Sequence, residues 1–96
     1  MADWDAIVRR QEARYADGLA RLPADPAARQ KQLVRMANVA ATAGLAGLMR
    51  GDEAAARTWL GRAAQRYRES WEGSPPASWG RPIGALKARL LAGDEL

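Results

Sequence analysis

The side chains in this sequence that could do chemistry are arginines and aromatics concentrated in its second half. Arginine beside Trp and Tyr is the composition enriched at the energetic centres of protein interfaces. The same combination binds nucleic acid through base stacking and charge. The group between positions 62 and 81 therefore indicates a binding surface, and it consists of Arg62, Arg66, Tyr67, Trp71, Trp79 and Arg81.

The aromatic members of this group also fit a structural role. Tyr67 and Trp71 fall on the core-facing side of the helix expected over residues 53–72. Trp79 stands in a linker rich in Gly, Ser and Pro, from which it can plug that core. Trp59 has two interpretations of equal weight: it anchors a partner, or it caps the edge of the core against the first helix.

The two arginines on the expected third helix are informative through their spacing. Arg62 and Arg66 stand four residues apart, so their like charges repel mildly on a helix surface. That arrangement favours an anionic neighbour. Glu69 and Glu72 can supply one locally.

Catalytic residues are scarce in this chain. It has no Cys and no His, which removes thiolate chemistry, disulfides and the commonest general base and metal ligand. There is also no Gly-rich phosphate loop. The acidic pairs at 52–53 and 94–95 have a simpler role as helix caps. We therefore expect a protein that is not an enzyme, with no metal site and no cofactor.

The net charge of +4 comes from 15 Lys and Arg against 11 Asp and Glu. Cations and acids are interspersed, and an Arg-rich, Ala-rich composition is typical of GC-rich genomes. A positive face that meets phosphate or an acidic partner is the alternative interpretation. The longest charge-free run, residues 36–49, is too short for a membrane span of about 20 residues. No basic-then-apolar leader opens the chain, so we expect a cytoplasmic protein with no membrane partner.

A six-residue phrase occurs twice, at 48–53 and 90–95, and each copy runs from apolar residues into Gly-Asp-Glu. Gly is the usual left-handed residue just past a helix end, and Asp is a good N-cap for the next helix. A helix-length segment follows the first copy, whereas only Leu96 follows the second. This pattern predicts a helical-hairpin repeat interrupted at its second turn, and it leaves open whether the natural protein continues beyond Leu96.

The hydrophobic spacing predicts a single all-α domain over residues 1–96 with about four helices, at 3–22, 26–50, 53–72 and 82–91. Asp3 and Asp25 are the expected N-caps of the first two helices, and Pro26 suits a first helical turn. The second helix is apolar around most of its circumference, which is typical of a central helix. No stretch alternates with period two, so we expect no sheet.

The second and third expected helices resemble a tetratricopeptide repeat. The small pair Ala43-Gly44 precedes the turn Gly51-Asp52, and Ala56, Leu60 and Ala63 follow at the spacing A-x3-F-x2-A of that family. The match covers residues 40–68, with other residues in place of the family's Trp, Tyr and Pro, and the spacing of 42 residues exceeds the usual ~34. The resemblance implies antiparallel helical hairpins and a groove that binds a peptide or protein.

Three functions remain open at this point. The first is a non-enzymatic protein-interaction module or scaffold of helical-repeat type. The second is a small basic nucleic-acid-binding domain, in which residues 74–80 and a short helix at 81–89 act like a helix-turn-helix. The third is a small-ligand binder that uses a cleft lined by the small residues of the second helix.

The fourth expected helix carries more apolar residues than one contact with the third helix can cover. We therefore expect that surface to be occupied by a second copy in a homodimer or by polypeptide absent from this chain. The predicted partner-binding residues are Trp59, Arg62, Arg66, Trp79, Arg81, Leu86 and Leu90.

Overall fold

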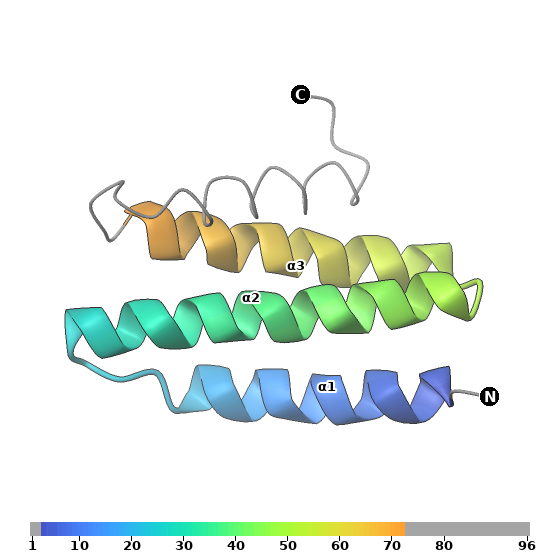
Figure 1. The fold of residues 1–96 in the computed structure, drawn as a ribbon, viewed down its shortest axis with the longest axis horizontal. Coiled ribbons are helices and arrows are strands. Elements are labelled where there is room, and N and C mark those ends of the chain that lie inside the picture. The colour runs from blue at the N-terminus through green and yellow to red at the C-terminus, as the bar shows by residue number, and fades with distance from the viewer. Residues whose placement is uncertain (1–2, 73–96) are drawn as a thin grey trace.

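The computed structural model describes residues 3–72, with side chains through Ser70, and this part of the chain forms three α-helices (Figure 1). The helices are α1 (Trp4–Ala20), α2 (Pro26–Met49) and α3 (Glu53–Glu72), and residues 3–72 contain no strand. Consecutive helices run antiparallel, and α2 lies between α1 and α3. The all-α prediction is confirmed for the described residues. The expected fourth helix and the second Gly-Asp-Glu phrase lie outside them.

The first helix begins where the sequence predicts and ends earlier. Asp3 is its N-cap, with Oδ1 accepting a hydrogen bond from the backbone N–H of Ala6 at 3.0 Å. The prediction that the helix reaches residue 22 was wrong by two residues. Because Pro23 disfavours helical backbone at the residue before it, the last turn closes at Arg21, whose N–H donates to the Gly18 carbonyl.

The second helix is capped by Asp25, whose Oδ2 accepts from the N–H of Ala28 at 2.9 Å, and Pro26 is its first residue. Both features were predicted. The helix ends at Met49, one residue before the expected boundary, and Arg50 is its C-cap.

The turn from α2 to α3 confirms the interpretation of the first Gly-Asp-Glu phrase. Gly51 has a φ of 81°, the left-handed conformation that L side chains rarely adopt. Its N–H donates to the Leu48 carbonyl, and the N–H of Asp52 donates to the Gly47 carbonyl, which is the Schellman pattern. Asp52 then begins α3, since its Oδ1 accepts from the N–H of Ala55 at 3.0 Å.

Glycines let α2 and α3 approach each other closely. A Cβ built on Gly44 would lie 2.6 Å from Cγ of Leu60, and one on Gly47 would lie 3.3 Å from the backbone N of Ala56. Ala43, on the same helix, is fully buried. The space beside the small residues of α2 is therefore occupied by α3. These residues do not form the cleft that the small-ligand hypothesis requires.

The C-terminal part of α2 is not buried all round. Leu45, Leu48 and Met49 are 48%, 42% and 64% exposed. Together with Trp4 and Ile7 of α1 they border an apolar hollow of about 460 Å³. The prediction that this helix is apolar and central holds for the faces that meet α1 and α3, whereas its C-terminal outer face is open.

Candidate functional site

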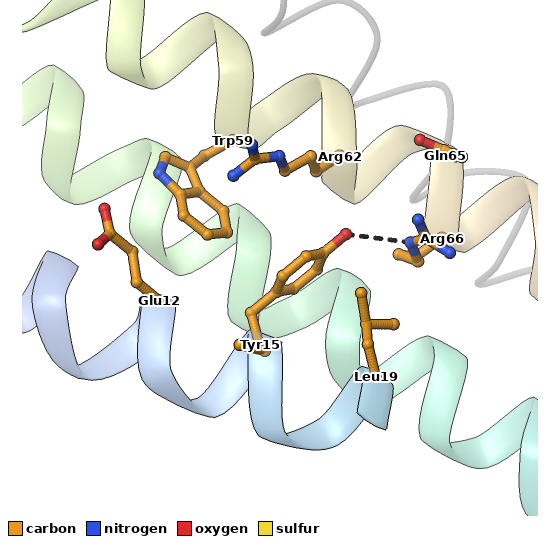
Figure 2. A pocket seen from close by; sticks show the side chains of 8 residues that line it. Glu12, Tyr15, Leu19, Trp59, Arg62, Gln65 and Arg66 are labelled. Carbon is orange, nitrogen blue, oxygen red and sulfur yellow. Dashed lines mark hydrogen bonds between the residues drawn. The ribbon is translucent and has the colours of Figure 1, made fainter. Parts of the chain in front are cut away.

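An open groove of about 720 Å³ lies between α1 and α3 (Figure 2). Its walls are contributed by two helices that run in the same direction on either side of α2. All of its lining residues belong to these two helices: Glu12, Tyr15, Ala16 and Leu19 of α1, and Trp59, Arg62, Gln65 and Arg66 of α3.

The α3 wall contains three of the predicted binding residues. Trp59, Arg62 and Arg66 are spaced i, i+3 and i+7, which places them on one face of the helix. Tyr67 belongs to a different face and does not line the groove. Of the members of this group that the structure describes, Arg62 and Arg66 line the groove together with Trp59, and Tyr67 does not.

The floor of the groove is aromatic. Tyr15 and Trp59 meet edge to face, with ring centroids 5.2 Å apart and an interplanar angle of 87°. Each is 7% exposed, and both belong to the buried core cluster. Of the two interpretations of Trp59, the structure supports a cap on the core against α1. One side of its ring still borders the groove.

Arg66 ties the two walls together. Its Nε donates to the hydroxyl oxygen of Tyr15 at 3.0 Å, and its Nη1 donates to both carboxylate oxygens of Glu69 at 3.0 and 2.7 Å. The anionic neighbour expected for this arginine is therefore Glu69. Because these bonds engage Arg66 on two sides, its role is to hold the groove together.

Arg62 lies about one helical turn from Arg66 but makes different contacts. Its guanidinium carbon lies 4.5 Å from the centroid of the Trp59 ring, a cation–π contact. The side chain is exposed, and no carboxylate within residues 3–70 forms an ion pair with it. Glu12 extends from the opposite wall, so the groove carries both signs of charge (Figure 2).

Tyr67 joins α3 to α2 outside the groove. It is half-buried against the core cluster, and its hydroxyl forms a hydrogen bond with Oδ1 of Asn38. Burial raises the pKa of the Tyr67 hydroxyl above its usual value of 10.0, because the phenolate would lose solvation. The predicted core role of Tyr67 is confirmed.

The remaining predicted binding residues, Trp79, Arg81, Leu86 and Leu90, lie outside the described residues, as does the side chain of Trp71. The sequence interpretation missed the contribution of α1 to the site. None of the predicted partner-binding residues belongs to α1, yet Glu12, Tyr15 and Leu19 of that helix line the groove. The i, i+4 spacing of Tyr15 and Leu19 was visible, but nothing local revealed that this edge of α1 meets α3.

No three His, Cys, Asp or Glu side chains come together as a metal-binding group in the described part of the chain. Within the same residues, no helix has the length and hydropathy needed to cross a membrane.

Comparisons with family models, curated proteins and solved structures found no match. The tetratricopeptide resemblance stays a prediction made from the sequence.

Proposed function

We propose that this chain is a non-enzymatic protein-interaction module that binds a peptide segment of another protein in the groove between α1 and α3. The observation that supports this proposal is the combination of an aromatic floor, Tyr15 and Trp59, with the exposed guanidinium of Arg62 above it. Aromatic and Arg side chains at the centre of a concave surface are the composition of binding hot spots. The backbone and side chains of a peptide can contact both the aromatic floor and the guanidinium.

The helical-repeat character belongs to the same proposal. The close contact of Gly44 with Leu60 joins two positions that resemble a tetratricopeptide hairpin. This contact supports a hairpin of that type, extended by the expected fourth helix. Self-association through Leu86 and Leu90, and a cytoplasmic location, remain predictions.

The charges of the groove favour a peptide over a nucleic acid. Glu12 and Glu69 lie in or beside it, and both would repel phosphate.

The proposal is tested by selecting binders from a random library of short peptides and measuring their affinity for two variants. Ala16 lines the groove, whereas Ala13 is an exposed residue of the same helix that does not line it. Ala16→Gln should obstruct the groove and weaken binding, whereas Ala13→Gln makes the same chemical change outside it. Equal affinities for the two variants, or binding only to random DNA with a steep salt dependence, would refute the proposal.

A further inference from the structure

We propose that the groove recognises an acidic side chain, with Arg62 as the residue that binds the carboxylate of an Asp or Glu in the partner segment. An apolar side chain next to that acid would cover Tyr15 and Leu19. This inference rests on the proposed function and specifies its ligand chemistry. The observation that supports it is that the guanidinium carbon of Arg62 lies over the Trp59 ring and that Arg62 forms no ion pair within the described part of the chain.

The contact with the Trp59 ring leaves the N–H donors of Arg62 available to a ligand. A guanidinium carries its N–H donors in the plane of the group, so an aromatic ring under its face does not consume them. The contact also restricts the long side chain before any ligand arrives, which lowers the entropy lost on binding. A planar fork of donors held in this way matches a carboxylate in bidentate geometry.

The contacts of Arg66 explain why Arg62, and not Arg66, is assigned as the residue that binds the carboxylate. The Nε of Arg66 is engaged by Tyr15 and its Nη1 by Glu69, with the shorter carboxylate contact at 2.7 Å. A ligand carboxylate would have to displace Glu69 to bind Arg66. Among residues 3–70, no carboxylate is bound to Arg62 in this way.

The opposite wall limits how acidic the ligand can be. Glu12 borders the same groove from α1 (Figure 2), so a second carboxylate close to the first would be repelled. The floor beside it, made by Tyr15 and Leu19, offers apolar surface. The favoured ligand therefore has one acid flanked by an apolar residue, and it is not a run of acids.

The shape of the groove assigns the carboxylate to a side chain within a segment. Every lining residue belongs to α1 or α3, two helices that run in the same direction on either side of α2, so a chain can pass along the groove between them. From Glu12 to Leu19 the α1 wall extends about 10 Å. That length accommodates about three residues of an extended peptide. A chain end is not required.

The test uses three libraries of short peptides, each with acetylated N-termini and randomised flanking positions. The first has a fixed central Glu and an amidated C-terminus, the second has Gln at that position, and the third has Gln with a free C-terminal carboxylate. Affinities are measured for the unmodified protein and for Arg62→Gln, Arg62→Lys and Arg68→Gln. Arg68 is an exposed arginine of α3 that does not line the groove, so its change to Gln alters the net charge equally.

The Glu library should bind at least about tenfold more tightly than the Gln library, which corresponds to about 1.4 kcal/mol. Arg62→Gln should abolish that preference, and Arg68→Gln should keep it. Arg62→Lys should retain only part of it, because Lys keeps the charge and loses both the fork and the stacking. The ratio of Glu to Gln affinity is the readout, since a loss of folding alone would lower both affinities together.

Three results would overturn the inference. Equal binding of the Glu and Gln libraries, still sensitive to Ala16→Gln, would remove the acid preference and leave the proposed function intact. Preference for the free C-terminal library would assign the carboxylate to a chain end. If no library binds in a way that depends on Ala16, both the inference and the proposed function fail.

Discussion

The hydroxyl oxygen of Tyr15 accepts a hydrogen bond from Nε of Arg66 at 3.0 Å, although the two residues are 51 positions apart in the sequence. The same tyrosine meets Trp59 edge to face. These two contacts join α1 to α3 directly, whereas most helix contacts involve α2. Tyr15 therefore fixes the spacing of the groove walls.

Replacing this tyrosine tests that role. Tyr15→Phe keeps the ring against Trp59 and removes the acceptor of Arg66, so the free energy of unfolding should fall by about 1–3 kcal/mol. Urea unfolding followed by circular dichroism measures the change. A double-mutant cycle with Arg66→Gln should give a coupling of about 1 kcal/mol. Simple additivity of the two changes would show that the bond does not contribute to stability.

Two glycines allow a matched test of the packing between α2 and α3. Gly44 lies against Leu60, so Gly44→Ala forces a movement in the core that costs about 1–3 kcal/mol. Gly61 has no described side chain or backbone within 4 Å of a built Cβ, so Gly61→Ala should gain up to about 1 kcal/mol of helix propensity. Thermal unfolding should place the first variant below the unmodified protein and the second above it. The reverse order would contradict the assigned contact.

The turn before α3 provides a third prediction. Gly51 is in the left-handed region, where an alanine costs about 1–2 kcal/mol through contact of its Cβ with the following carbonyl. Gly51→Ala should therefore lower the free energy of unfolding by that amount, measured by urea denaturation. Within the part of the chain that the structure describes, no atom lies within 4 Å of a Cβ built at this position. An unchanged free energy of unfolding would show that the backbone at residue 51 does not adopt the left-handed conformation.

The burial of Tyr67 predicts a pH dependence. Its pKa is raised above 10.0 in the folded protein, so folding favours the protonated phenol. Its contribution to stability is complete below the unfolded pKa and is lost as the pH rises through the folded pKa. The chain has two tyrosines, so in Tyr15→Phe the phenolate absorbance reports Tyr67 alone. The midpoint of the Tyr67 titration should lie at a higher pH in buffer than in concentrated urea. A midpoint that is lower in buffer than in urea would rule out the burial of Tyr67.

The helices could be predicted from the sequence because the residues that begin and end them act locally. Asp3, Asp25 and Asp52 cap the three described helices as predicted, and Gly51 ends α2 in the predicted conformation. The end of α1 was misplaced because an apolar residue, Leu22, continues the stripe beyond the point that the following proline permits.

The candidate site could be predicted only in part. Trp59, Arg62 and Arg66 were chosen from their types, and helical spacing places all three on one wall. Two properties required the assembled fold. One is the opposite wall, which depends on how α1 lies across α2. The other is the difference between the two arginines, because Glu69 pairs with Arg66, whereas Arg62 forms no ion pair within residues 3–70.

The most direct test of peptide binding in the groove is chemical-shift mapping by NMR with a selected peptide. The indole signal of Trp59, assigned by its loss in Trp59→Phe, and the backbone amides of Ala16 and Arg62 should shift most and saturate at a single dissociation constant. Amides beside the exposed Leu45 should remain unchanged. Shifts confined to the apolar surface around Leu45, with none at Trp59 or Ala16, would contradict the assignment of the groove as the binding site.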